Sequence, residues 1–206
     1  KGNATFKSST NRAPRESTPG EPAKEQTITL RLKLLADVGL LGMPNAGKSS
    51  FVAAVSEAKL KIADYAFTTL KPALGMVRHH GVDMVMADLP GLIEGAADGV
   101  GLGHDFLKHV GRCKVQWHVV DMTQEKPAAA YKVIRKELKS YDAQFGSALC
   151  DLPEVVVLNK ADLVEAAEAK KIMAAFTKST KAKVLLISAG ARTGLEKVLG
   201  ALAERV

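Results

Sequence analysis

The fold of this 206-residue chain is indicated by one stretch of sequence, Gly42-Met43-Pro44-Asn45-Ala46-Gly47-Lys48-Ser49. The stretch follows a short apolar run at residues 36–41 and leads into helical periodicity at residues 48–57. It has the form G-x-x-x-x-G-K-S, and a strand before it and a helix after it are the context in which such a loop binds phosphate. Backbone N–H groups and the positive end of the helix then surround the anion. Lys48 is expected to contact the β- and γ-phosphates, and Ser49 to bind Mg²⁺.

Apolar runs alternate with helical periodicity over the rest of the chain, which predicts an α/β fold. The fold class we predict is the three-layer P-loop NTPase type, with a mostly parallel sheet and helices on both faces. One antiparallel hairpin is expected, with its turn at residues 79–81. Residues 27–34 also have the loose alternation of a strand. The predicted strands are 73–78, 82–87, 115–120, 155–158 and 184–187, and the predicted helices are 104–112, 127–144, 164–177 and 194–205.

The choice of base is indicated by Asn159-Lys160-Ala161-Asp162, which directly follows an apolar strand. A carboxylate at Asp162 accepts two hydrogen bonds from N1–H and N2–H₂ of guanine, whereas adenine offers neither donor, so such a site rejects adenine. Asn159 is expected near N7 of the base, and the stem of Lys160 over the ring face. The small residues Ser188-Ala189-Gly190 end the next strand and allow N–H groups to approach O6.

A second loop begins where the strand at residues 82–87 ends, at Asp88-Leu89-Pro90-Gly91. Asp88 is placed to hold Mg²⁺, and the N–H of Gly91 to meet the γ-phosphate. Five glycines lie between residues 91 and 103, so ordering this loop is entropically costly, as in a segment that one nucleotide state orders. Thr68 or Thr69 is expected to complete the Mg²⁺ shell, and spacing alone leaves the choice open.

Composition places the chain among ordinary globular proteins, with 47% apolar and 25% charged residues. It has no run of about 18 apolar residues to span a membrane, and we expect no secretory signal, because the first residues have no apolar core. The two cysteines, Cys113 and Cys150, are typical of a reducing compartment. Residues 1–35 hold seven Lys/Arg and three Asp/Glu, which is +4 of the net charge of +7. This basic segment is either a solvated arm or a surface for polyanions such as RNA. The chain does not begin with Met, so we expect a fragment of a longer protein.

Four motifs of the chain are GMPNAGKS, KIADYAFTTLKP at 61–72, DLPGLIEGAADGVGLGHDFLKH at 88–109 and NKAD. Together they resemble the Obg/CgtA family of ribosome-associated GTPases. The resemblance implies GTP hydrolysis to GDP and phosphate with Mg²⁺, and action on the large ribosomal subunit and its RNA during assembly, in the bacterial cytoplasm. It also implies that residues 1–35 are a linker and the tail of a truncated glycine-rich domain, and that residues 36–206 are the GTP-binding domain. We expect a monomer.

The resemblance assigns Mg²⁺ binding to Thr69 and the first switch segment to residues 67–71. The predicted metal ligands are therefore Ser49, Thr69 and Asp88, and the predicted catalytic groups are Lys48, Thr69, Gly91 and Asn45. The predicted nucleotide-binding residues are Gly42, Met43, Pro44, Asn45, Ala46, Gly47, Lys48, Ser49, Ser50, Phe67, Thr68, Thr69, Leu70, Lys71, Asp88, Leu89, Pro90, Gly91, Asn159, Lys160, Ala161, Asp162, Ser188, Ala189 and Gly190.

Intrinsic hydrolysis is predicted to be slow, because Leu92 stands where many related GTPases place a Gln that orients the attacking water. In similar GTPases without that Gln, an Asn at the position of Asn45 helps to bind K⁺, so K⁺ is a candidate cofactor. Two other functions are considered. A nucleotide-stabilised module that binds ribosome or RNA with negligible turnover is compatible with Leu92. An ATP-dependent enzyme such as a small kinase leaves Asn159 and Asp162 unexplained.

Overall fold

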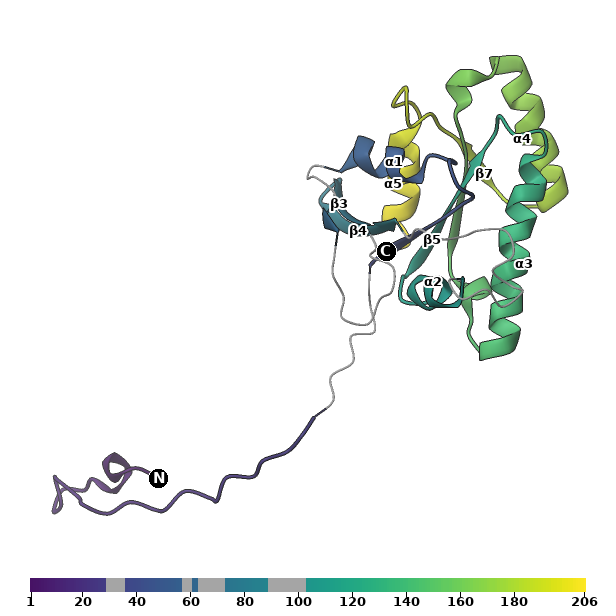
Figure 1. The fold of residues 1–206 in the computed structure, drawn as a ribbon. Helices are drawn as coiled ribbons and strands as arrows, with labels where there is room; N and C mark the ends of the chain where they lie inside the picture. Colours follow the sequence, from purple (N-terminus) through teal and green to yellow (C-terminus); the bar gives the residue numbers. More distant parts are fainter. Residues whose placement is uncertain (29–35, 57–60, 63–72, 89–102) are drawn as a thin grey trace. The chain divides into compact units, whose positions relative to one another are not determined.

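A computed structural model describes residues 1–28, 36–56, 61–62, 73–88 and 103–206 (Figure 1). The chain divides into two compact units, Lys1–Leu32 and Lys33–Val206. The described part of the first unit has one short 3₁₀ helix, η1 (Asn3–Phe6), and no strand. Most of the strand predicted at residues 27–34 lies outside the described residues.

The second unit is built on one sheet, which has seven strands among the described residues. Their order is β2-β3-β4-β1-β5-β6-β7. The pairs from β4 to β7 are parallel, which confirms the predicted fold class. The hairpin of β3 and β4 is antiparallel as expected, and β2 adds a second antiparallel pair. The strands are β1 (Val38–Leu41), β2 (Lys61–Ile62), β3 (Ala73–His79), β4 (Val82–Asp88), β5 (Val115–Asp121), β6 (Glu154–Asn159) and β7 (Val184–Leu186).

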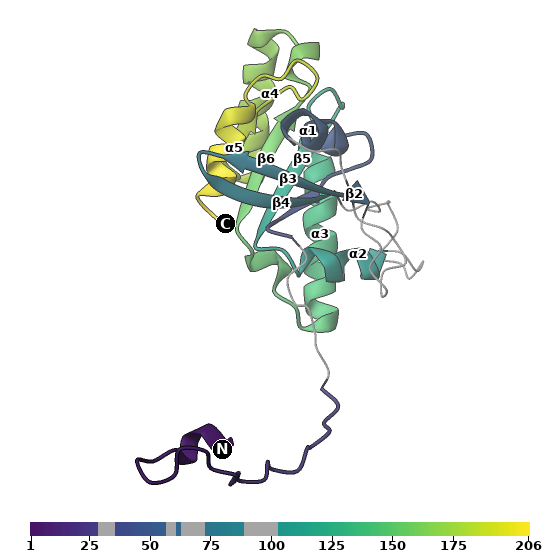
Figure 2. The ribbon, with the colours of Figure 1, turned by 90° about the vertical axis from the view of Figure 1, so that its left-hand side faces the viewer.

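Helices cover both faces of this sheet (Figures 1 and 2). Side chains of a strand alternate between its two faces, so Val38 and Leu40 pack with α1 and α5 while Leu41 packs with α2 and α3. Val156 and Leu158 likewise pack with α3 and α4. The helices are α1 (Lys48–Val55), α2 (Gly103–Val110), α3 (Pro127–Phe145), α4 (Ala166–Thr180) and α5 (Leu195–Ala203), with short 3₁₀ helices η3 (Leu149–Asp151) and η4 (Ala161–Leu163).

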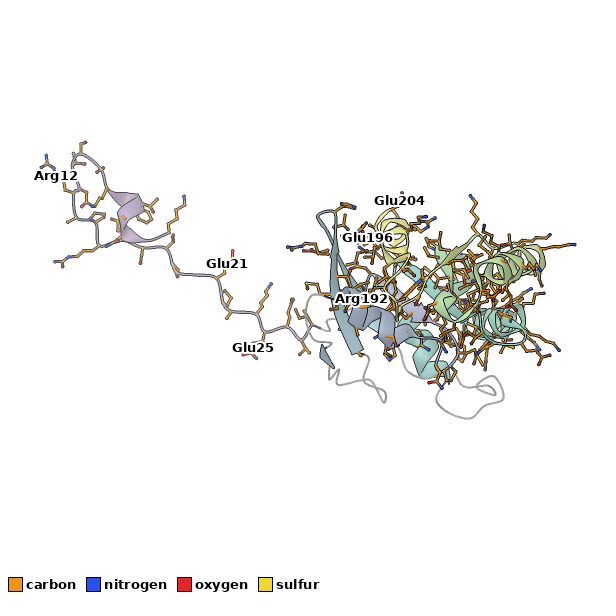
Figure 3. All side chains as sticks on the ribbon, turned by 90° about the horizontal axis from the view of Figure 1, so that it is seen from above. Arg12, Glu21, Glu25, Arg192, Glu196 and Glu204 are labelled. Atoms are coloured by element: carbon orange, nitrogen blue, oxygen red, sulfur yellow. The ribbon has the colours of Figure 1, made fainter. Side chains whose placement is uncertain are left out.

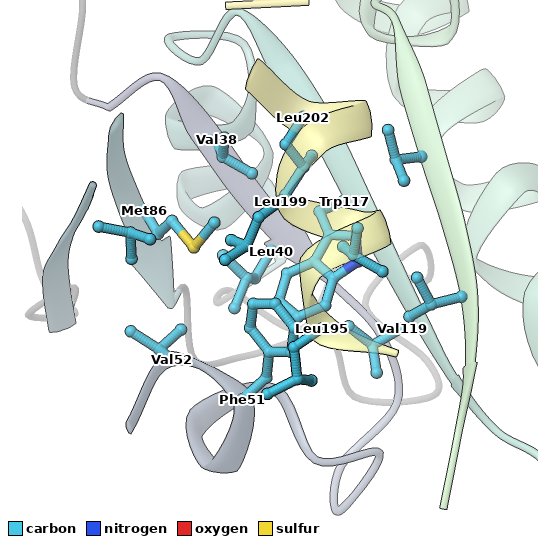
Figure 4. Packing of buried hydrophobic residues seen from close by; sticks show 14 of the residues in the cluster. Val38, Leu40, Phe51, Val52, Met86, Trp117, Val119, Leu195, Leu199 and Leu202 are labelled. Atoms are coloured by element: carbon cyan, nitrogen blue, oxygen red, sulfur yellow. The ribbon is translucent and has the colours of Figure 1, made fainter. Parts of the chain in front are cut away.

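The face under α1 and α5 has an aromatic pair at its centre (Figure 4). Trp117 of β5 and Phe51 of α1 are fully buried, and their ring centroids lie 3.9 Å apart. Leu195, Leu199 and neighbouring apolar residues complete this cluster. Because Phe51 lies in the first turn of α1, burying its ring holds the start of that helix against the sheet.

The β3–β4 hairpin closes through a two-residue turn at His80 and Gly81, inside the predicted 79–81 turn. Both residues have positive φ, 47° and 82°, as a type I′ turn requires. His79 and Val82 form the last pair of the ladder. Within the part of the chain that the structure describes, no helix is both long and apolar enough to cross a membrane.

Candidate nucleotide-binding site

The candidate site lies at the carboxyl edge of the parallel strands. β1 lies between β4 and β5, so the chain order of the strands reverses at β1, and ligands bind at such a point in open α/β sheets. Leu40 is in register with Asp88, and Asp121 with Asn159. The loop that follows β1 and the polar ends of β4, β5 and β6 therefore share one edge.

Two glycines of the loop at residues 42–49 are required by close packing. A Cβ on Gly42 would lie 2.4 Å from the carbonyl oxygen of Val119, and a Cβ on Gly47 would lie 2.1 Å from Nδ2 of Asn159. Gly47 also has a φ of 96°, which side chains rarely adopt. No other residue type fits either position without moving its neighbours.

The N-terminus of α1 is left open toward the loop. Gly47 is its N-cap residue and no side chain caps the helix, so the first N–H groups keep their capacity to bind an anion. Asn45 is exposed on the loop and has a φ of 60°. This backbone has the form expected of a phosphate-binding loop.

Lys48 places its ammonium group inside the curve of the loop. Its Nζ donates to the carbonyl oxygens of Gly42 at 2.8 Å and Met43 at 3.0 Å. Burial lowers the pKa of Lys48, and the nearby carboxylate of Asp88 partly opposes this shift. A partly desolvated cation interacts strongly with phosphate, because little water competes for it.

Two of the three predicted metal ligands are brought together. The hydroxyl of Ser49, in the first turn of α1, donates a hydrogen bond to Oδ2 of Asp88 at the end of β4. Asp88 is buried and Ser49 is exposed. A hydroxyl and a carboxylate are oxygen donors of the kind that Mg²⁺ takes in phosphate sites, so these residues fit that ion.

Asn159 connects the phosphate loop to the loop after β7. Its Nδ2 donates to the carbonyl oxygen of Ala46 at 2.8 Å, and its Oδ1 accepts from the N–H of Ala189 at 3.0 Å. The side chain is buried. Both polar ends of the amide are therefore used within the protein, a bridging role that the sequence did not predict. The N–H of Ala189, expected near O6 of the base, is bonded to Asn159 in this conformation.

Lys160 is held by a carboxylate that the sequence analysis missed. Its Nζ lies 2.6 Å from Oδ2 of Asp121, and Oδ1 of Asp121 accepts hydrogen bonds from the N–H and hydroxyl of Thr123. Burial raises the pKa of Asp121, but the bonds from Lys160 and Thr123 outweigh burial and hold this pKa below its usual range. The signal available in the sequence was an Asp at the end of the apolar strand at 115–120, beside the end of the next strand.

The residue predicted to select the base, Asp162, is exposed in η4. Its carboxylate makes no hydrogen bond or ion pair with any residue that the structure describes. Ser188 and Ala189, which follow β7, are buried, and Gly190 is exposed. The carboxylate of Asp162 is thus free to receive a ligand. The predicted contacts at residues 67–71 and 89–91 lie outside the described residues.

Replacing Gly47 by Ala is expected to weaken GDP binding at least tenfold, because the new Cβ collides with Asn159. The matched control is Gly146→Ala after α3, which also has positive φ but has no atom within 4 Å of the new Cβ. Gly146→Ala is expected to lose about 1 kcal/mol of stability through backbone strain, and Gly47→Ala is expected to lose more because the collision with Asn159 adds to the strain. Calorimetric titration with GDP separates the two, and equal affinities would contradict the role of this contact.

Replacing Asp121 by Asn removes the charged partner of Lys160 and is expected to lower the unfolding free energy by about 1–2 kcal/mol at pH 7. Because the pKa of Asp121 is depressed in the folded state, its contribution is present above the usual carboxyl value and is lost as the pH falls through the folded pKa. Urea unfolding from pH 7 down to pH 3 should show the wild-type advantage shrinking below about pH 4. The exposed control Asp151→Asn should behave like the wild type at every pH.

Comparison with known proteins identifies the relatives of this chain. The chain is 48% identical over 202 residues to the GTPase Obg of Zymomonas mobilis subsp. mobilis, a match that covers 98% of this chain and 57% of the relative. The chain therefore spans little more than half of that relative's length. The family resemblance read from the motifs is confirmed by this match.

Solved structures share the fold at low sequence identity. The G domain of the T. maritima FeoB iron transporter has a TM-score of 0.59 at 22% identity, covering 82% of this chain and 96% of that one. Era in complex with MgGDPNP and nucleotides 1506–1542 of 16S ribosomal RNA has a TM-score of 0.63 at 19% identity, covering 82% and 55%. The family model described as 50S ribosome-binding GTPase matches residues 37–160. With the phosphate loop, the strand ends and Asn159 all inside that match, the chain belongs to the family of 50S ribosome-binding GTPases.

Proposed function

We propose that this chain binds GTP and hydrolyses it slowly to GDP and phosphate, as a switch that acts on the large ribosomal subunit and its RNA. The observation that carries the proposal is one sheet edge that combines a phosphate loop, an oxygen pair for Mg²⁺ and an unpartnered carboxylate at Asp162. Support for the ribosomal role comes from the family and from Era, whose structure includes ribosomal RNA. The proposal extends to a monomer in the cytoplasm, with residues 36–206 as the GTP-binding domain and residues 1–35 as linker and tail.

Different residues of the site have different roles in phosphoryl transfer: some bind the phosphates, some would bind Mg²⁺, and one positions the phosphate loop. Lys48 and the open N-terminus of α1 hold the negative charge of the phosphates, while Ser49 and Asp88 would hold Mg²⁺. When bound, Mg²⁺ would supply positive charge that offsets the charge of the phosphates. Asn159 fixes the distance between the phosphate loop and the residues after β7 that are expected to contact guanine. Catalysis by such a site is positioning and electrostatic stabilisation, with no covalent step on the protein.

Slow turnover is expected because Leu92 stands where many related GTPases have a Gln that orients the attacking water. Leu92 has an apolar side chain, which orients no water and stabilises no developing charge. A partner or a cation must then supply the missing contribution. Asn45 is exposed in the phosphate loop. Its amide oxygen is a ligand that K⁺ can take.

Asp162→Asn tests the guanine specificity. The wild type is expected to prefer GDP to ADP at least 100-fold in competition with a fluorescent guanine nucleotide, and the variant less than tenfold. The amide introduced in the variant can donate a hydrogen bond where the carboxylate accepted one. The variant should therefore gain affinity for xanthosine diphosphate (XDP), whose purine has a carbonyl at C2 in place of the amino group of guanine. Glu165→Gln, an exposed neighbour, is the control. Equal binding of ADP and GDP by the wild type would favour the ATP-dependent alternative.

Turnover of GTP should be at least fivefold faster in K⁺ than in Na⁺ at equal ionic strength. Asn45→Gly keeps the positive φ of this position but removes the amide oxygen, so the variant should show equal rates in the two salts. Phosphate release is measured with and without large ribosomal subunits. Equal rates for the wild type would remove K⁺ from the mechanism, and no turnover under any of these conditions would favour the non-hydrolysing binding module.

A further inference from the structure

A group of two imidazoles and one carboxylate, all potential metal ligands, lies where the β3–β4 hairpin meets α5. These side chains are not part of the nucleotide site. His79 ends β3, His80 is the first residue of the hairpin turn, and Glu196 lies in the first turn of α5. One ligand atom from each of these residues lies within 4.8 Å of the other two. Figure 3 shows Glu196 on the side of α5 that faces the hairpin.

The backbone of the turn brings the two imidazoles together. His80 has a φ of 47°, a conformation that type I′ turns impose. Its ring lies edge-on to that of His79, with 4.2 Å between the centroids. Two adjacent residues of an extended strand would point to opposite faces, so the turn is what places both rings on one side.

The orientation of His79 is set by its packing on α5. The side chain is buried, and its Nε2 would lie 3.7 Å from a Cβ built on Gly200. This edge of the ring therefore lies next to Gly200 of α5, and Nδ1 faces Glu196. His79 Nδ1 and Glu196 Oε2 are 3.4 Å apart.

That separation fits metal ligands better than a direct ion pair. A charge-assisted N–H···O bond closes to about 2.7–2.9 Å. Ligands held about 2.0–2.2 Å from a tetrahedral zinc lie about 3.3 Å from one another. Glu196 is 82% exposed and His80 is exposed, so both groups are accessible to an ion from solution.

We propose that His79, His80 and Glu196 form a surface site for a divalent transition-metal ion of the zinc class. Two imidazole nitrogens and one carboxylate oxygen make a three-residue donor set that leaves a coordination position for water. The bound ion would join the hairpin to α5. β4 runs from this hairpin to Asp88, and α5 follows the loop at residues 188–194, so the ion would link two segments that each reach the nucleotide site.

The test is zinc binding to the untagged 206-residue chain, with GDP and excess Mg²⁺ present so that the nucleotide site is occupied. The wild type should bind one Zn²⁺ with a dissociation constant of about 10 µM or below in competition with a chromophoric chelator. Added Zn²⁺ should also raise its melting temperature, because the assembled site binds the ion more tightly than the unfolded chain does. When Co²⁺ replaces Zn²⁺, the bound ion should absorb strongly in the visible range, as four-coordinate Co²⁺ does.

Glu196→Gln and His80→Asn should each weaken Zn²⁺ binding at least tenfold. Both positions are exposed, and Asn tolerates the positive φ of the turn, so both variants should fold. Glu204→Gln, also exposed near the end of α5, is the matched control and should bind like the wild type. Guanine-nucleotide affinity is measured alongside and should be unchanged, which keeps this test independent of the proposed function. No binding by the wild type at 100 µM Zn²⁺, or binding that survives both substitutions, would overturn the proposal.

Discussion

The amide of Asn159 is the contact on which the geometry of the candidate site depends. It spans from the carbonyl oxygen of Ala46 in the phosphate loop to the N–H of Ala189 after β7, and it fills the space above Gly47. A buried amide whose donor and acceptor are both satisfied is rigid, because losing either bond leaves a buried polar group unpaired. The loop predicted to bind the phosphates and the loop predicted to contact the base are thereby held in one relative position.

Charge along this edge is arranged in separate pairs. Lys48 lies inside its loop near the Asp88 carboxylate, and Lys160 is bonded to Asp121. Asp162, in contrast, faces solvent without a partner among the described residues. The paired groups are positioned in advance, and the unpaired carboxylate keeps its acceptors for a ligand. Such preorganisation reduces the rearrangement that binding requires.

The framework that carries these groups follows from simple patterning. Strand residues alternate between the face under α1 and α5 and the face under α2, α3 and α4, so both faces of β1, β5 and β6 are buried. Burial on both faces is what makes parallel strands read as continuous apolar runs. The strand order then reverses beside β1, and this reversal places the phosphate loop next to the ends of β4, β5 and β6.

Local rules were enough to predict the phosphate loop, the alternation of strands and helices, and the turn at residues 79–81, because loop glycines, periodicity and turn chemistry act over a few residues. Strand β2 was missed because its two residues are too few to show the alternation of a strand. It is recognised only by its antiparallel pairing with β3. The bridge that Asn159 makes between two loops and the bond between Asp121 and Lys160 could be found only in the folded chain. The same is true of the meeting of His79 and His80 with Glu196, a residue more than 100 positions further along the chain. These contacts depend on strand order and helix packing, which bring together residues that no local pattern relates.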